Sequence, residues 1–235
     1  MERRRFVTGC AAVATVAGLS ASARAWAAAT PRFYSRARLV DIHGDPLKAR
    51  QLASRTNYVF SYPFAATPCF LLDLGRPVAA AASLLRADGA TYAWSGGVGA
   101  RHSVVAFSAI CAHKLAYPTR DVSFIRYQRS RSATSSGKVI HCCADHSVYD
   151  PAAGARVVAG PAPQPLACVA LEHDAARDEL YALGTLGAEQ FGRFFEKYAM
   201  KLSLEYGELA RARAPVTDTT VVSKLTNYCR NTIEC

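Results

Sequence analysis

Two short cysteine–histidine boxes hold the side chains in this chain that are best suited to binding a metal. In the first box Cys111 and His113 are separated by one residue, and in the second Cys143 and His146 are separated by two. Thiolate sulfur and neutral imidazole nitrogen are ligands both of zinc and of iron–sulfur clusters. We therefore predict that these four side chains are metal ligands, and we predict no catalytic residue beside them.

The sequence around both boxes resembles that of the Rieske iron–sulfur family. Lys114 and Leu115 continue the first box, and the Ser-Val-Tyr-Asp-Pro run at 147–151 continues the second. A Gly-Pro-Ala-Pro run at 160–163 then follows, where the family has a loop that covers its cluster. The resemblance is concentrated in residues 103–166.

This resemblance implies a [2Fe-2S] cluster with mixed ligands. Cys111 and Cys143 would hold the buried iron as thiolates, and His113 and His146 would hold the outer iron. Replacing two thiolates by neutral imidazoles makes the cluster less negative and raises its reduction potential. A bound imidazole can also lose its second ring proton when the cluster is oxidised, which would couple electron transfer to proton transfer.

Zinc is the alternative metal, because two cysteines and two histidines also form tetrahedral zinc sites with overlapping spacings. Three features favour the cluster. The one-residue spacing of the first box is unusual for a zinc finger, both boxes follow strand-like runs, and the 160–163 turn stands where the resemblance expects it. The rival interpretation is a zinc-stabilised structural or binding module without redox activity.

The second box departs from the family pattern. Rieske proteins of cytochrome bc complexes join the two loops by a disulfide, and the corresponding positions here are Ala116 and Asp145. Cys142 directly precedes Cys143, but its side chain should point the opposite way on an extended segment. Only Cys143 gives the two-residue spacing to His146, so Cys142 is the less favoured ligand.

In the family the second histidine usually begins a His-Gly-Ser-x-Tyr/Phe-Asp run. Here the run at 146–150 is His-Ser-Val-Tyr-Asp, one residue shorter, which leaves its register open. Ser147 and Tyr149 are both candidates to donate a hydrogen bond towards a sulfur atom, and such a bond would raise the reduction potential. We therefore make no prediction that the potential suits quinol oxidation.

Short apolar runs punctuated by glycine and proline predict an all-β fold with antiparallel sheets of the Rieske type. The run at 81–86 fits either a strand or a short helical turn. Strands are expected at 58–62, 69–74, 91–94, 103–108, 123–127, 155–159, 166–171 and 179–183.

The period changes after Gly187, where aromatic and apolar residues recur at helical spacing from Phe191 to Leu202. Thr185 is available as the helix cap and Pro215 ends the helical region. The predicted organisation is a Rieske-like β domain at 30–185, with its cluster-binding part at 103–166, followed by a C-terminal helix and tail at 186–235.

Residues 1–29 are predicted to be a twin-arginine (Tat) export signal or an N-terminal anchor. Consecutive arginines at 3–5 precede a Phe-Val pair, a weakly apolar, alanine-rich run and small-residue cleavage sites at 25–29. The twin-arginine route carries folded proteins, which suits a protein whose cofactor is inserted before export. The expected location is the periplasm, either free or anchored to the membrane.

The formal net charge of +10 indicates a partner that is an acidic protein or a membrane surface, since no nucleic-acid motif is present. The segment between the boxes is strongly basic, and it is either a solvated loop or a docking face. We expect single-electron transfer as a subunit or carrier of an oxidoreductase rather than stand-alone catalysis. The expected redox partners are a cytochrome b, a cytochrome c or a molybdenum-enzyme subunit.

Beyond Cys10 in the leader and the two predicted ligands, five cysteines remain, so at least one lacks an intramolecular partner. Cys229 and Cys235 bracket a short tail loop and are candidates to bridge in an oxidising compartment, but the sequence leaves the pairing of the five cysteines open. Cys69 and Cys168 fit equally well a disulfide or two buried thiols.

Overall fold

The computed structural model describes residues 31–187 and 189–235, so the predicted export signal lies outside the described residues. The strands are β1 (Arg32–Val40), β2 (Tyr58–Ser61), β3 (Pro68–Asp73), β4 (Ala81–Leu85), β5 (Thr91–Trp94), β6 (Val104–Ser108), β7 (Val122–Ser123), β8 (Ile125–Gln128), β9 (Val139–Cys142), β10 (Ser147–Asp150), β11 (Arg156–Ala159), β12 (Cys168–Asp174), β13 (Glu179–Leu186), β14 (Thr219–Val221), β15 (Ser223–Lys224) and β16 (Asn231–Thr232). The helices are α1 (Phe191–Lys197), α2 (Ala199–Tyr206), α3 (Leu209–Ala212) and α4 (Leu225–Tyr228), with 3₁₀ turns at Ala49–Gln51 and Pro151–Ala153.

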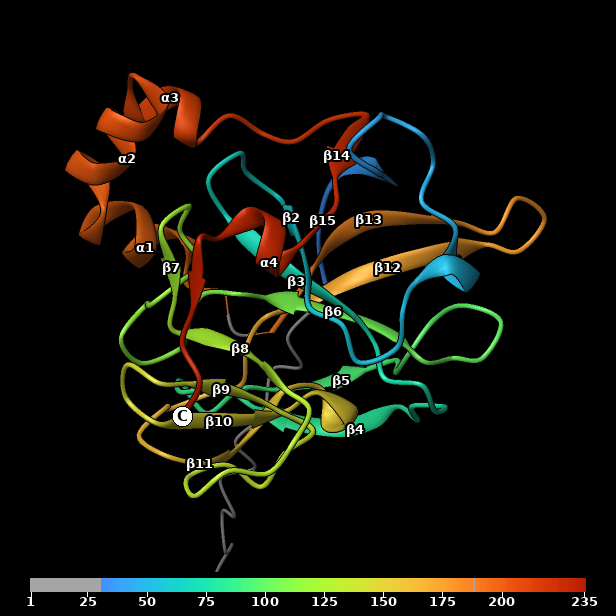
Figure 1. Ribbon diagram of the computed structural model, residues 1–235, viewed down its shortest axis with the longest axis horizontal. Helices are drawn as coiled ribbons and strands as arrows, with labels where there is room; N and C mark the ends of the chain where they lie inside the picture. The colour runs from blue at the N-terminus through green and yellow to red at the C-terminus, as the bar shows by residue number, and fades with distance from the viewer. Residues whose placement is uncertain (1–30, 188) are drawn as a thin grey trace, which may run out of the picture.

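These elements confirm the predicted all-β fold with helical structure near the C-terminus. Figure 1 shows the larger sheet in one layer, a smaller sheet and the β4–β5 hairpin in a second layer, and α1–α3 grouped at one end. Within the described part of the chain, no helix has both the length and the apolar character needed to cross a membrane.

The larger sheet has eight strands in the order β14-β1-β13-β12-β6-β3-β2-β15. Its strand pairs are antiparallel except for β1 with β14. The two edge strands, β14 and β15, are separated along the chain by Val222 alone. The two edges of the sheet therefore lie next to each other, and this place is called the seam of the sheet. The Thr220 hydroxyl of β14 donates to the Ser61 carbonyl of β2 across this seam, at 2.8 Å.

The smaller sheet is an antiparallel meander in the order β11-β10-β9-β8. It packs against one face of the larger sheet through a shared apolar core. In β3, Phe70 and Leu72 point into this core, while Cys69 and Leu71 point into a second core on the opposite face. Strands buried on both faces read as continuous apolar runs, which is why the pattern at 69–74 does not alternate.

The predicted C-terminal helix is present but is interrupted at Tyr198, giving α1 and α2. Thr185 does not cap it, because this residue belongs to β13 and its hydroxyl bonds to Glu189. The residue that precedes α1 is Gln190. Phe194 and Phe195 of α1 are buried in a third apolar cluster, together with apolar residues that flank the first box.

The structure also contains β1, where the sequence analysis predicts no strand. Arginines at 32, 36 and 38 obscure its pattern. The guanidinium of Arg36 lies 3.4 Å from the centroid of the Tyr181 ring and pairs with Glu172, so this long side chain covers the sheet surface. Ala37 and Leu39 alternate with these arginines and are fully buried.

Asp73, at the end of β3, is a fully buried carboxylate that joins three segments. It accepts hydrogen bonds from the Ser54 hydroxyl at 2.8 Å and the Gly75 amide at 2.9 Å, and it pairs with Arg101 at 2.7 Å. Burial raises the pKa of Asp73, but these hydrogen bonds, one from Ser103 and the Arg101 charge together hold it below its ordinary value. The ionised form therefore stabilises the fold.

We expect Asp73→Asn to lower the free energy of unfolding by about 2 kcal/mol at neutral pH, because bonds to a charged acceptor are lost. Since the pKa is lowered on folding, the contribution is complete above the unfolded value of about 3.9 and is lost as the pH falls through the folded value. Urea unfolding at neutral pH and at about pH 3 checks this. Asp88→Asn, which removes an exposed surface pair, is the control. An Asp73→Asn effect that stayed equally large in acid would contradict the assignment.

Candidate metal centre

The first box lies on a loop that begins where β6 ends. Cys111 is fully buried, its amide donates to the Ala116 carbonyl at 2.8 Å, and the Leu115 amide donates back to the Cys111 carbonyl at 3.0 Å. Leu115 has a positive φ of 58° and packs into the third apolar cluster, which contains the aromatic residues of α1. The Gln190 side chain also donates to the Ala112 carbonyl at 2.7 Å, so the helical segment holds the loop in place.

The second box lies at the turn between β9 and β10. Ser147 pairs with Cys142 across this hairpin, and the His146 amide donates to the Cys142 carbonyl at 2.7 Å. Side chains alternate along β9, so Ile140 and Cys142 point into the core while His141 points away from it. Position 142 therefore faces the first box.

Four potential ligand side chains from the two loops meet at this place. The sulfurs of Cys111 and Cys142 and a carboxylate oxygen of Asp145 all lie within 4.8 Å of one another. Asp145 Oδ2 is 3.3 Å from Cys111 Sγ and 2.9 Å from His113 Nδ1. Both cysteines are fully buried, whereas the His113 side chain is 37% exposed.

The structure brings together Cys111 and His113 of the predicted ligand set, and it places Cys143 and His146 elsewhere. Cys143 forms a disulfide with Cys235, and a sulfur engaged in a disulfide is not a thiolate ligand. His146 is exposed, with a positive φ of 58°. Cys142, the less favoured candidate in the sequence, takes the second thiol position.

Asp145 is the member of this group that the sequence analysis did not predict, because the prediction relied on a Cys-x-x-His spacing. The stretch after the second box gave a usable signal. Counting from Cys142 instead of Cys143 restores the residue missing before Tyr149, and it places Asp145 where the family has its second histidine. His146 then occupies the position of the family's glycine, which agrees with its positive φ.

Tyr149, in β10, contacts the loop that carries the first box. Its hydroxyl accepts a hydrogen bond from the Ala112 amide at 3.0 Å and lies 3.4 Å from Cys111 Sγ. Since the amide supplies one hydrogen, the hydroxyl hydrogen is available to Cys111. Of the two candidate donors in the sequence, Tyr149 has the sulfur within reach.

The thiols of the centre differ in acidity. The contact with the Cys142 thiol lowers the pKa of Cys111 to about 7, against the effect of burial, and Tyr149 and two backbone amides act in the same direction. The same contact raises the pKa of Cys142. Burial raises the pKa of Asp145, but hydrogen bonds from the Ser147 amide and from both thiols bring it below its ordinary value. An ionised carboxylate and a readily formed thiolate are both suited to bind a cation.

The loop at 160–163 begins against the backbone of the second box. Gly160 has a φ of 84°, and a Cβ there would come within 2.2 Å of the His146 carbonyl oxygen. Glycine is therefore required at 160 both by its conformation and by the close approach of the two backbones.

The Cys143–Cys235 disulfide attaches the C-terminal tail to the second box and links residues 92 positions apart. Figure 1 shows the C-terminus beside β9 and β10. The candidate Cys229–Cys235 bridge does not form, because β16 pairs with β7 and carries Cys235 past Cys229 to the smaller sheet. Cys229 is a buried free thiol, and so are Cys69 and Cys168, which confirms the buried-thiol interpretation for that pair.

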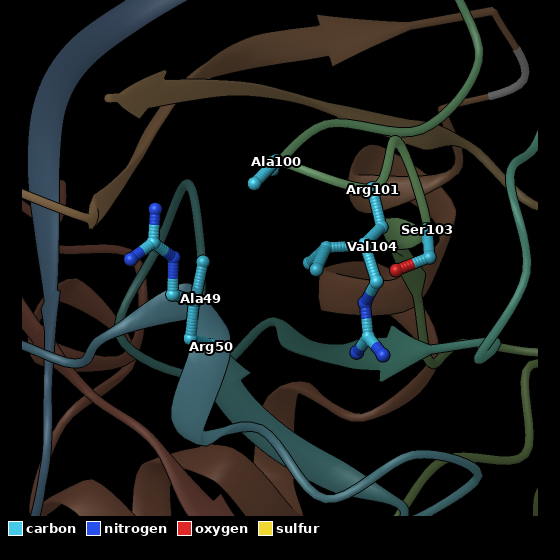
Figure 2. Close-up of a pocket in the computed structure, with 7 residues that line it drawn as sticks. Ala49, Arg50, Ala100, Arg101, Ser103 and Val104 are labelled. Atoms are coloured by element: carbon cyan, nitrogen blue, oxygen red, sulfur yellow. The ribbon is translucent and has the colours of Figure 1, made fainter.

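A cavity of about 300 Å³ lies beside Gly99 and Val104, away from both boxes. Figure 2 shows the guanidinium groups of Arg50 and Arg101 at its sides. Arg101 is already paired with Asp73. The lining residues include no cysteine, histidine or carboxylate, so they provide no acid, base or metal ligand there.

The fold is all-β, and two loops bring together a cluster of side chains that could hold a metal. No protein-family model matches the chain. Among solved structures, the chain is similar to the soluble domain of the Rieske protein II (soxF) from Sulfolobus acidocaldarius, with 28% sequence identity and a TM-score of 0.47. The alignment covers 65% of this chain and 78% of that chain.

We expect peptide mapping without reduction to recover Cys143 linked to Cys235. Cys235→Ser should lower the free energy of unfolding by about 2–4 kcal/mol, because it releases a long loop of the unfolded chain. Chemical denaturation measures the change. Cys229→Ala, on the same tail, keeps the bridge and should change stability by no more than about 1 kcal/mol. Recovery of a Cys229–Cys235 peptide would contradict the structure.

Proposed function

We propose that the protein transfers single electrons through a [2Fe-2S] cluster held by Cys111, Cys142, His113 and Asp145. The observation that carries this proposal is the convergence of two buried thiols, one imidazole and one carboxylate from two loops. The proposal keeps the Rieske resemblance of the sequence and changes two members of the expected ligand set.

The donor chemistry of these residues fits such a cluster. Two adjacent buried thiols suit one iron, and the half-buried imidazole of His113 with the buried carboxylate of Asp145 suits the other. A bound cluster of this kind accepts and releases one electron at a time. Because Asp145 is anionic where a Rieske centre has a neutral imidazole, we expect a lower reduction potential than that of the two-histidine type.

The chain itself supplies protection and tuning. The shared core and the third apolar cluster keep water away from Cys111. The Tyr149 hydroxyl is placed to donate a hydrogen bond to Cys111 Sγ. A hydrogen bond to a ligand sulfur stabilises added negative charge and raises the potential. His113, at 37% exposure, is the ligand closest to solvent and so the expected point of electron entry or exit.

We further propose an exported, periplasmic location and an acidic redox partner. The Cys143–Cys235 disulfide supports an oxidising compartment, in agreement with the twin-arginine pattern. Exposed basic residues follow the first box, at Lys114, Arg120, Arg129, Arg131 and Lys138. A partner such as a cytochrome c, a cytochrome b or a molybdenum-enzyme subunit would be attracted by this charge.

We expect the purified full chain to contain two irons and two acid-labile sulfides, with an electron paramagnetic resonance signal in the reduced state. Cys142→Ala should abolish this signal, because one iron loses a thiolate. The double variant Cys143→Ala/Cys235→Ala is the control and should retain the cluster. Zinc without iron or sulfide would favour the zinc module, and loss of the cluster only in the control variant would restore Cys143 as the ligand.

We expect Asp145→His to raise the reduction potential by on the order of 100 mV, because a neutral ligand replaces an anionic one. Redox titration followed by electron paramagnetic resonance measures this shift. Asp121→Asn changes the formal charge of the exposed segment between the boxes and should leave the potential nearly unchanged. Equal potentials for Asp145→His and the unmodified protein would exclude Asp145 as a ligand.

A further inference from the structure

His141 is a buried histidine that the proposed electron-transfer centre does not use. Its exposure is 0%, and neither ring nitrogen has a hydrogen-bond partner among the described residues. Leaving a buried polar group unpaired is unfavourable, so an unpaired buried imidazole indicates a ligand or partner that completes it.

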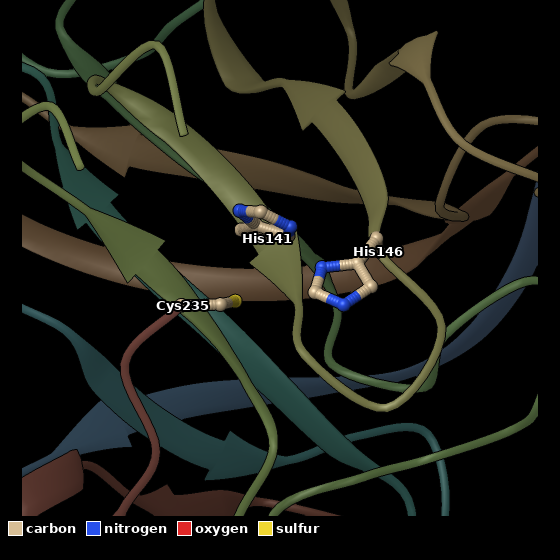
Figure 3. A group of neighbouring side chains, drawn as sticks. All are labelled: His141, His146 and Cys235. Atoms are coloured by element: carbon tan, nitrogen blue, oxygen red, sulfur yellow. The ribbon is translucent and has the colours of Figure 1, made fainter. Parts of the chain in front are cut away.

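The surroundings of His141 supply further metal-binding atoms. A ring nitrogen of His141, one of His146 and Cys235 Sγ all lie within 4.8 Å of one another. Figure 3 shows that these side chains converge from β9, from the turn before β10 and from the C-terminal tail. Cys143 Sγ is bonded directly to Cys235 Sγ, so a fourth potential ligand adjoins this group without belonging to it.

Gln128, on the neighbouring strand β8, faces the two sulfurs. Its side-chain nitrogen lies 3.4 Å from Cys235 Sγ and 3.9 Å from Cys143 Sγ. An amide N–H donated to sulfur stabilises a thiolate more than a disulfide, because the thiolate carries the charge. The Gln128 amide is therefore placed to stabilise the two thiolates that form when the disulfide is reduced.

We propose that reduction of the Cys143–Cys235 disulfide creates a zinc site made of His141, His146, Cys143 and Cys235. Two thiolates and two imidazoles are a tetrahedral zinc set. The site lies on the outer face of β9, whereas Cys142 points into the core on the inner face. It uses none of the four residues assigned to the cluster, and so it does not rest on the proposed function.

The chemistry balances with a dithiol as the reductant. The dithiol supplies two electrons and two protons, the Cys143–Cys235 bond breaks to give two thiols, and the dithiol becomes a disulfide. Zinc binding then displaces the two thiol protons. Reoxidation of the two cysteines reforms the bridge and releases the metal, so the disulfide determines whether the site exists.

The test uses the full chain carrying Cys111→Ala and Cys142→Ala, so that the first centre cannot compete for metal. Co²⁺ is titrated into this protein before and after reduction and removal of the reductant. We expect the reduced protein to bind one equivalent, with thiolate-to-metal absorption and tetrahedral visible bands, and Zn²⁺ to displace it. The oxidised protein should show neither absorption.

Single substitutions then assign the ligands. His146→Ala, at an exposed position, should weaken binding by about 100-fold or more, and Gln128→Leu by about 10-fold. His43→Ala changes an exposed histidine elsewhere and should have no effect. Circular dichroism of each sample shows whether the fold is kept. A reduced protein that binds no Co²⁺, or binding that His146→Ala leaves unchanged, would overturn the proposal.

Discussion

The alternation of side chains along β9 is the constraint on which the chemistry of this protein depends. Ile140 and Cys142 face the core, while His141 and Cys143 face the tail. As a result, the sulfur of Cys142 lies beside Cys111, whereas the sulfur of Cys143 forms the disulfide with Cys235. Cross-strand pairing with β8 and β10 fixes this alternation, and a slip of one residue would exchange the two faces.

The rest of the fold keeps the two loops at a fixed separation. β6 is buried on both faces and delivers Cys111 directly from the larger sheet, while β9 and β10 deliver the second box from the smaller sheet. The shared core joins these sheets beneath the site, and α1 presses on the first loop from outside. Each loop thus depends on a different sheet, and the packing between the sheets sets the distance between the ligands.

Much of this arrangement could be predicted from local pattern. Apolar runs with glycine and proline between them located most strands, and the spacing of Cys111 and His113 located the first loop. The spacing to His146 favoured Cys143, whereas the spacing to Tyr149 fits Cys142. Strand register and a tail contact from 92 residues away place the sulfur of Cys142, and not that of Cys143, beside Cys111. β1 was missed for a related reason, since its arginines are outward side chains whose role depends on Tyr181 of a distant strand.

The seam of the larger sheet also affects how the chain can fold. β14 is near the end of the chain and pairs with β1, near the start of the described residues. After one more residue, β15 pairs with β2 at the opposite edge of the sheet. Such distant pairings are slow to form, because a long loop must be ordered before they contribute. During synthesis the sheet therefore stays open until residues 219–224 have emerged from the ribosome. Until then β1 and β2 remain unpaired edges, and an unpaired edge is where a sheet can pair with another chain.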